Sequence, residues 1–264
     1  KSTRRQSNVG SIRCCVCNSS IVYASNVLPE TSHQWFNYWG CKRLKKYYKA
    51  LLFGSIGTLV ETSEIQRKSF NEAFKKKGLN WYWTKEEYIK LLNKSGGSDR
   101  IKEYAKKKNT KVNAKQLRDL KTKLFNNYLK KNHLILRPGV KSIINLCNKE
   151  KIRLAFVTST SKNNINSILF SLRKSINRKN FSFIGNSNLV KNLKPNPDIY
   201  LLALKKLKLK STECLAIEDS QESLNSAVNA KIKCIIFPGK FHLNKKFKNA
   251  YKKLSKLNKN IILI

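Results

Sequence analysis

The sequence has little negative charge and no methionine. Only 15 of its 264 residues are Asp or Glu, against 55 Lys and Arg, which leaves a formal net charge of +40. Such an excess opposes compaction and is unusual for a free soluble enzyme, so it favours a polyanionic neighbour. Methionine is absent even from position 1, which indicates a fragment or a processed form. No run of about 18 apolar residues exists, which excludes a membrane-spanning helix.

Cysteine is too sparse for a disulfide framework. Seven cysteines are spread over the chain, mostly singly, which is typical of a reducing compartment. Hydrophobic residues make up 41% of the sequence and aromatic residues 10%, so the chain can bury a sizeable core and is not a disordered basic tail. The length allows one large α/β domain or one domain with an insertion.

Residues 1–48 differ in composition from the rest. The first 28 residues contain no acid, are rich in serine and carry Arg4, Arg5 and Arg13, as organelle transit peptides do. Residues 21–25 (IVYAS) resemble a plastid processing site. We therefore expect a basic, transit-like N-terminal extension that could also dock onto a partner, and a plastid location, with the mitochondrion as the alternative.

Two smaller features of this extension have two interpretations each. A zinc site is conceivable from Cys14, Cys15, Cys17, His33 and Cys41, but a second closely spaced pair is missing, which favours transit or unstructured sequence. An aromatic cluster, WFNYW, precedes a basic run, KRLKK. It is either a segment packed on the domain surface or a docking or nucleic-acid contact.

From Lys49 onward, strand and helix patterns alternate. The apolar run ALLF (50–53) ends at a glycine-rich turn, which is typical of a buried parallel strand. Further strands are predicted at 153–157, 214–217 and 234–237, and amphipathic helices at 61–77, 140–147, 199–207 and 224–230, with Lys-rich helical sequence up to about residue 133. The alternation predicts an α/β fold, a parallel sheet covered by helices on both faces.

Polar residues stand where four segments of this predicted sheet end. They are GSIGT (54–58), Thr158 with Ser159, Lys194 before Pro195, and Glu218-Asp219-Ser220. Ligands of open α/β sheets bind at the carboxyl ends of the strands. A hydroxyl, a lysine and a pair of carboxylates at one edge would suit a phosphate group with a divalent cation.

These segments resemble motifs of the haloacid dehalogenase superfamily, in its branch of β-phosphoglucomutases and Calvin-cycle sugar-bisphosphate phosphatases. The resemblance rests on ALLFGSIGTLVET (50–62), LAFVTSTS (154–161), KPNPDIY (194–200) and CLAIEDS (214–220). It implies a Rossmann-like parallel-sheet core, here 49–61 and 134–264, with an inserted helical cap at 62–133. Within that cap, WYW (81–83) and SGGSDR (95–100) look like the part that faces the substrate.

The first motif departs from the family's pattern D-x-D-G-T. The resemblance implies that the first aspartate attacks phosphorus and binds the metal, and that the second exchanges protons with the leaving group and water. Those two positions hold Gly54 and Ile56, which have neither a nucleophile nor an exchangeable proton. The adjacent Ser55 should point away from the missing side chain. We therefore expect no catalytic residue at this motif and a protein that is not an enzyme.

The other family positions are retained. The resemblance implies that Thr158 and Lys194 are a remnant of the phosphate site and that Glu218 and Asp219 are a remnant of the metal site, weak or lost. Alternatively, Lys194 pairs with Glu218 or Asp219 as a structural bridge. No cofactor is expected. Mg²⁺ would bind only if the remnant of the metal site keeps some affinity for it. The histidines at 33, 133 and 242 are far apart, and the sequence supports only solvated or packed roles for them.

Two kinds of function remain. One is a catalytically degenerate pseudophosphatase that serves as a structural or binding subunit of a large organellar, plastid assembly. Its partner would be RNA, as in a ribosome, or an acidic membrane-protein complex. The alternative is a Mg²⁺-dependent sugar-phosphate phosphatase with residual activity, or a sensor that binds a phosphorylated ligand without turnover.

Overall fold

The computed structural model describes residues 9–13, 20–24, 47–92 and 96–263. The chain divides into two compact units, 1–45 and 46–264. In the first unit, β1 (Val9–Arg13) and β2 (Ser20–Ala24) pair antiparallel, which the transit-like composition did not predict. The cysteines and His33 of the conceivable zinc site and the aromatic cluster lie outside the described residues. No helix in the described ranges is long and apolar enough to cross a membrane.

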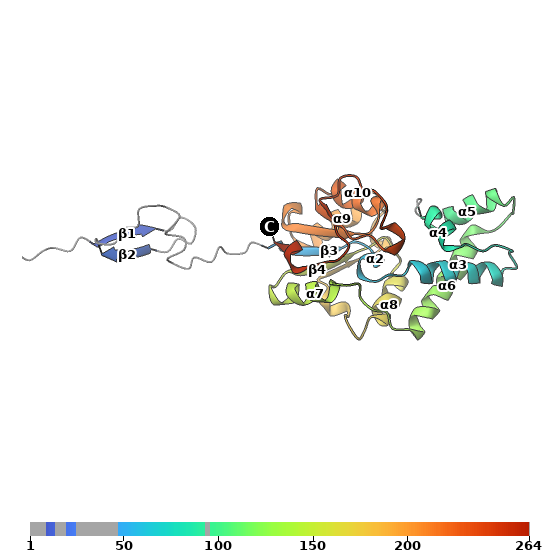
Figure 1. Ribbon diagram of the computed structural model, residues 1–264, viewed down its shortest axis with the longest axis horizontal. Helices are drawn as coiled ribbons and strands as arrows, with labels where there is room; N and C mark the ends of the chain where they lie inside the picture. The colour runs from blue at the N-terminus through green and yellow to red at the C-terminus, as the bar shows by residue number, and fades with distance from the viewer. Residues whose placement is uncertain (1–8, 14–19, 25–46, 93–95, 264) are drawn as a thin grey trace, which may run out of the picture. The chain divides into compact units, whose positions relative to one another are not determined.

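The second unit is built on a parallel sheet of six strands in the order β5-β4-β3-β6-β7-β8. Figure 1 labels two neighbouring strands of this sheet, β3 and β4. The strands are β3 (Ala50–Phe53), β4 (Arg153–Val157), β5 (Phe183–Gly185), β6 (Cys214–Glu218), β7 (Lys233–Ile236) and β8 (Lys252–Lys253). The predicted α/β parallel-sheet fold is confirmed. The two outer strands escaped prediction because three and two residues are too short for a hydrophobic pattern.

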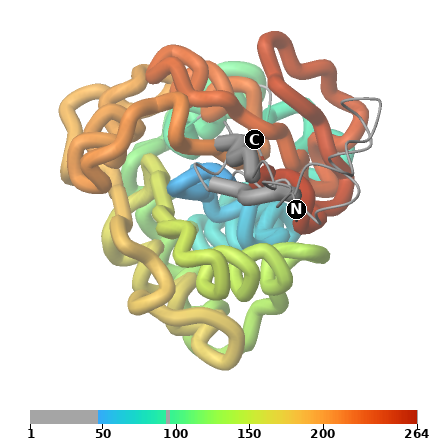
Figure 2. The backbone as a smooth tube through the Cα atoms, turned by 90° about the vertical axis from the view of Figure 1, so that its left-hand side faces the viewer, coloured from blue at the N-terminus to red at the C-terminus, as the bar shows by residue number. Residues whose placement is uncertain are grey.

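Helices cover both faces of this sheet. They are α2 (Ile56–Leu59), α7 (Val140–Lys149), α8 (Lys162–Ser171), α9 (Asp198–Leu207) and α10 (Gln221–Asn229). Leu51 and Phe53 join one buried cluster with residues of α7 and α8, whereas Ala50 and Leu52 join a second cluster with residues of α9 and α10. Figure 2 shows the same two layers on opposite sides of the sheet. Side chains alternate along a strand, so two buried faces require the continuous apolar run seen in the sequence.

Four helices between α2 and α7 enclose a third hydrophobic cluster. They are α3 (Ser63–Lys76), α4 (Lys85–Leu91), α5 (Gly97–Lys107) and α6 (Ala114–Lys131). Trp83 is fully buried there, with its ring centroid 4.7 Å from that of Phe70 and 4.8 Å from that of Phe74. Trp81 is also buried, and Tyr82 between them is exposed. Two of the three aromatic residues expected to face a substrate therefore form the core of this helical segment. The exact borders of the cap remain a prediction.

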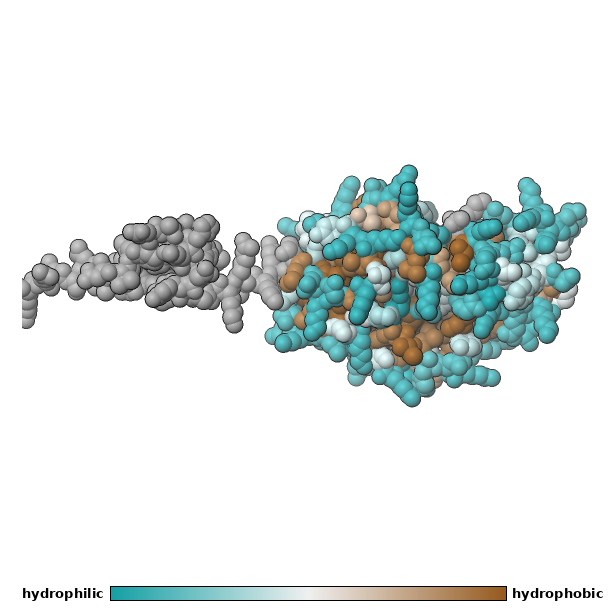
Figure 3. Space-filling view, in the orientation of Figure 1, coloured by the Kyte–Doolittle hydropathy of each residue, from teal (hydrophilic) through white to brown (hydrophobic). Residues whose placement is uncertain are grey.

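Charged side chains cover much of the surface. Figure 3 shows hydrophilic side chains projecting from most of the visible face of the second unit. Negative charge is unevenly distributed, because no Asp or Glu follows Glu222. The C-terminal part, which includes the edge strand β8, is therefore purely basic. Charge on an edge strand also discourages pairing with another sheet.

Candidate functional site

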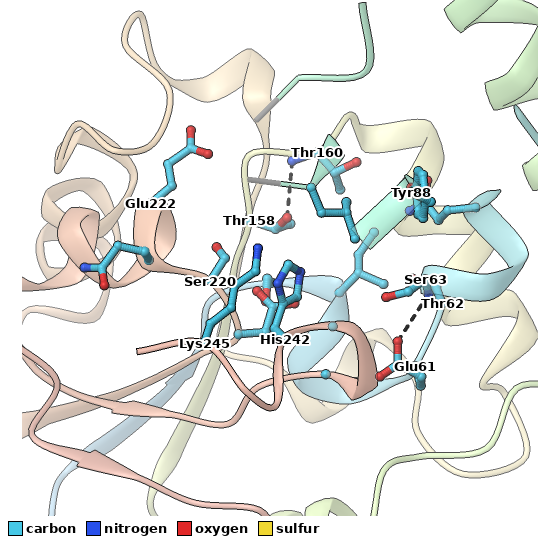
Figure 4. A pocket seen from close by; sticks show the side chains of 18 of the residues that line it. Glu61, Thr62, Ser63, Tyr88, Thr158, Thr160, Ser220, Glu222, His242 and Lys245 are labelled. Carbon is cyan, nitrogen blue, oxygen red and sulfur yellow. Dashed lines mark hydrogen bonds between the residues drawn. The ribbon is translucent and has the colours of Figure 1, made fainter. Parts of the chain in front are cut away.

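A cavity of about 470 Å³ lies at the carboxyl edge of the sheet (Figure 4). The loop after β3, the residues after β4 and β6, and the segment after β7 form one side of it. Tyr88 of α4 and Arg100 of α5 close it from the helical segment. The topology thus brings together three of the four predicted strand ends, as expected for an open parallel sheet. The fourth, Lys194, does not line the cavity.

Thr158 is the predicted phosphate ligand that does line the cavity. It is buried, and its Oγ1 accepts a hydrogen bond from the backbone N of Thr160 at 3.2 Å. The hydroxyl proton remains able to donate to an anion. Thr160 lines the same cavity, and its own Oγ1 accepts a hydrogen bond from Asn164 of α8. Hydroxyl groups fixed in this way can hold phosphate oxygens without moving.

Lys194 is buried, and its ammonium group donates three hydrogen bonds to other groups of the protein. Its Nζ donates to the backbone oxygen of Gly54 at 2.5 Å, to that of Val157 at 2.8 Å and to Glu218 Oε1 at 2.5 Å. An ammonium group has three N–H donors, so none is left for a ligand in this arrangement. The structural bridge between Lys194 and Glu218, one of the two interpretations open from the sequence, is present, and the phosphate-binding role of Lys194 stays a prediction.

Glu218 fills the space beside Gly54. It is completely buried, and its Oε1 accepts hydrogen bonds from Lys194 and from the Tyr200 hydroxyl at 2.5 Å. A Cβ atom added at Gly54 would lie 1.9 Å from that same oxygen. Burial raises the pKa of Glu218, although Lys194 counteracts part of this effect. The carboxylate therefore occupies the position from which an aspartate at position 54 would extend.

The predicted metal ligands are separated. Asp219 lines the cavity, where its Oδ2 would lie 1.8 Å from a Cβ at Gly57, whereas Glu218 is turned into the core. Ile56 supplies no oxygen. In the described part of the chain, no group of three or more His, Cys, Asp or Glu is placed to hold a metal ion. Mg²⁺ prefers near-octahedral oxygen ligands, and these residues do not fit that requirement.

His242 and Lys245 are among the cavity residues that sequence reasoning missed. His242 ends the short 3-10 helix Lys240–His242, which follows β7, and Lys245 lies three residues further on. Burial and the neighbouring Lys245 lower the pKa of His242, although Asp219 and Glu61 partly oppose this. The available signal was position: His242 follows the Pro238-Gly239 break at the end of the last predicted strand.

A second, more basic cavity of about 370 Å³ shares Gln66, Arg100 and Thr160 with the first. Arg118 and Lys121 of α6 line it. Lys121 donates a hydrogen bond to Gln66, and its ammonium lies 4.8 Å from the centroid of the Phe70 ring. Burial, with Arg100 and Arg118 adding to it, lowers the pKa of Lys121 to about 7. An anion bound here would favour the charged ammonium.

Arg137 fixes two loops of the site. Its Nη1 donates to the backbone oxygens of Gly57 at 2.6 Å and Phe237 at 2.8 Å, and its Nη2 donates to that of Pro238 at 2.7 Å. The guanidinium also stacks on the Phe237 ring, 3.4 Å from its centroid. One side chain thereby joins the turn after β3 to the segment that leads to His242.

Arg137→Lys is expected to lower the free energy of unfolding by about 1–3 kcal/mol, because an ammonium cannot reproduce the planar set of donors. Urea denaturation followed by circular dichroism measures this. Arg173→Lys is the matched control, since Arg173 also stacks on a phenylalanine and donates to a backbone oxygen but is exposed. We expect the control to change stability by less than about 0.5 kcal/mol. Equal effects of the two substitutions would contradict the role of Arg137.

The chain matches known proteins over most of its length. Residues 56–237 match the family model described as haloacid dehalogenase-like hydrolase. Protein CbbY of Cereibacter sphaeroides is 34% identical over 205 residues, covering 76% of this chain and 89% of that protein. The CBBY-like protein of Arabidopsis thaliana is 33% identical over 213 residues, covering 76% of this chain and 66% of that protein. A more distant Arabidopsis relative, 26% identical over 70% of this chain and 17% of its own length, is named Protein SUPPRESSOR OF QUENCHING 1, chloroplastic.

Solved structures agree with these matches. Crystal structures of CbbY from Rhodobacter sphaeroides, one in complex with phosphate and one of a mutant in complex with xylulose-1,5-bisphosphate, each have a TM-score of 0.71 and 33% identity. Each match covers 79% of this chain and 94% of the other. Similarity to hydrolases that extends through the site contradicts the prediction that the chain is not an enzyme. That prediction rested mainly on Gly54 and Ile56, and it overlooked the polar cavity beside them.

Proposed function

Because this chain belongs to the haloacid dehalogenase-like hydrolase family, as its four motifs indicated, we propose that it is a slow phosphatase of phosphorylated sugars. The observation that supports this most directly is the cavity at the carboxyl edge of the sheet. Thr158, Arg100 and Lys245 offer it a hydroxyl and two positive charges, which are the groups that hold a phosphate. Hydrolysis is slow because Gly54 and Ile56 provide neither the nucleophile nor the acid/base group of the family.

The substrate proposed is a sugar that carries two phosphates. The two cavities share Arg100 and Thr160, and Arg118 and Lys121 add further positive charge on the far side. One phosphate would lie beside Thr158 and the other beside Lys121. The complex of CbbY with xylulose-1,5-bisphosphate supports this class of ligand, since that protein has the same fold.

No divalent cation is part of the proposal. The donor set offers Asp219 but not Glu218, which is completely buried and does not line the cavity. The expectation from the sequence that no cofactor is needed thus continues as a proposal. Positive side chains would neutralise the phosphate charge in place of the cation.

The test is phosphate release from xylulose-1,5-bisphosphate by the purified chain, with EDTA or with added Mg²⁺. We expect slow release that is equal under both conditions and a higher melting temperature with the ligand. Arg100→Gln should abolish both effects, and the exposed Arg173→Gln should abolish neither. Release that requires Mg²⁺ would contradict the metal-free site. If the chain shows no phosphate release and no stabilisation by the ligand, the proposed function is overturned. Stabilisation without release would favour a phosphorylated-ligand sensor.

A plastid location is also proposed. The acid-free N-terminal composition and a relative named chloroplastic support it. A fluorescent fusion of residues 1–48, imaged in plant cells with chloroplast and mitochondrial markers, tests it. The polyanionic partner expected from the net charge, RNA or an acidic membrane-protein complex, stays a prediction. A pull-down with and without nuclease would distinguish these two partners.

A further inference from the structure

The first motif leaves the proposed hydrolysis without a group that accepts a proton. Water attacks phosphorus efficiently only when a base removes its proton, and such a base contributes about 10²–10⁴-fold in rate. Four side chains that line the 470 Å³ cavity could accept one: Glu61, Asp219, Glu222 and His242. Two of them, Glu61 and His242, lie on loops that a hydrogen bond joins.

Glu61 is used to hold the loops of the site. Its Oε1 accepts a hydrogen bond from the backbone N of Ser63 at 3.2 Å, and its Oε2 accepts one from the backbone N of Lys240 at 2.7 Å. The second bond connects the loop after α2 to the 3-10 helix that carries His242. Glu61 is therefore a positioning residue for the segment of His242.

His242 is half-buried and lines the cavity. Its backbone N donates to the oxygen of Gly239 at 2.8 Å, which fixes the turn. Figure 4 shows the ring beside Lys245, with Ser220 and Thr158 at the same part of the cavity. The imidazole thus lines the same cavity as Thr158, the residue proposed to hold a phosphate.

The charges around His242 suit an uncharged imidazole. Lys245 from its own loop and Arg100 from α5 lower its pKa together with burial, while Asp219 after β6 and Glu61 after α2 act in the opposite direction. The net effect lowers the pKa below its ordinary value of about 6.5. At neutral pH the ring is mostly uncharged and able to accept a proton.

We propose that His242 is the general base of the hydrolysis and replaces the missing aspartates of the first motif. A ring nitrogen takes a proton from a water molecule, whose oxygen forms a bond to phosphorus. The bond between phosphorus and the sugar oxygen breaks, and that oxygen takes the proton back from the imidazolium. The products are inorganic phosphate and the sugar monophosphate with one free hydroxyl group, and Lys245 stabilises the charge that develops on the phosphate oxygens.

This role rests on the proposed phosphatase function and is tested with the full chain. His242→Asn should lower the kcat for release of phosphate from xylulose-1,5-bisphosphate by about 100-fold, with little change in KM. His133→Asn is the control, because His133 is exposed outside the cavity. In His242→Gly, added imidazole should restore part of the lost rate, whereas it should have no effect on the wild type or on His133→Gly.

The outcomes separate this role from the function on which it rests. No release by the wild type would overturn both. Release at the wild-type rate by His242→Asn would overturn the role of His242 and leave the phosphatase. A loss that imidazole does not restore, together with a lower melting temperature, would also overturn it, because it would show that His242 acts through folding.

Discussion

Lys194→Met is expected to lower the free energy of unfolding by about 3–5 kcal/mol. Lys194 is the ion-pair partner of Glu218, which is completely buried. Glu218 Oε2 already has no hydrogen-bond partner among the described residues, so the loss of Lys194 leaves a buried carboxylate with the Tyr200 hydroxyl alone. Urea denaturation of the purified chain, followed by tryptophan fluorescence, measures the change.

Two further variants isolate the ion pair. Lys191→Met removes an exposed lysine of the same loop and should cost less than about 0.5 kcal/mol. Lys194→Met combined with Glu218→Leu should recover most of the loss, because an apolar pair of similar volume replaces two buried charges. A loss below about 1 kcal/mol in Lys194→Met, or no recovery in the double variant, would contradict this account of the pair.

Secondary structure was predicted most accurately from the sequence in the elements whose burial requires apolar residues. β3 is covered on both faces, so all four of its residues had to be apolar and the strand was recognisable. β8 is an exposed edge of two lysines, and no local pattern distinguishes it from a loop. Trp81 and Trp83 also follow this rule, since alternate residues of an extended segment share one side and Tyr82 points to the other. The sequence alone could not show whether Trp81 and Trp83 face a substrate or pack in a hydrophobic core.

The site was predicted less completely because its arrangement depends on a missing side chain. Glu218 and Asp219 are neighbours in the chain, yet one enters the core and the other lines the cavity. Glu218 enters the core because Gly54 leaves space there for its carboxylate. The sequence motif shows only that the aspartate is absent, not which side chain takes its place. The position of His242 after the last predicted strand was a weak signal, because the loop that carries it is placed by Arg137 and Glu61 from distant parts of the chain.

Gly54→Asp, the substitution that restores the first aspartate, is expected to destabilise the protein by about 3–5 kcal/mol. The new Cβ would lie 1.9 Å from Glu218 Oε1 and 2.3 Å from the Tyr200 hydroxyl. Either the carboxylate of Glu218 is displaced from Lys194 or the strand shifts, and two carboxylates then compete for one ammonium. Urea denaturation measures the loss. Ser55→Ala, which removes an adjacent buried hydroxyl without a partner, should cost less than about 0.5 kcal/mol.

A double-mutant cycle separates this competition from simple overcrowding. Glu218→Ala alone leaves Lys194 buried without a carboxylate, so it should be strongly destabilising. In the double variant with Gly54→Asp, the new carboxylate enters the vacated space and takes Lys194 as its partner. The double variant should therefore be less destabilised than the sum of the two single variants, by about 1–3 kcal/mol. Additive effects would mean that positions 54 and 218 do not share one space. If the double variant is instead less destabilised than that sum, restoring the first aspartate requires a change at Glu218 as well as at Gly54.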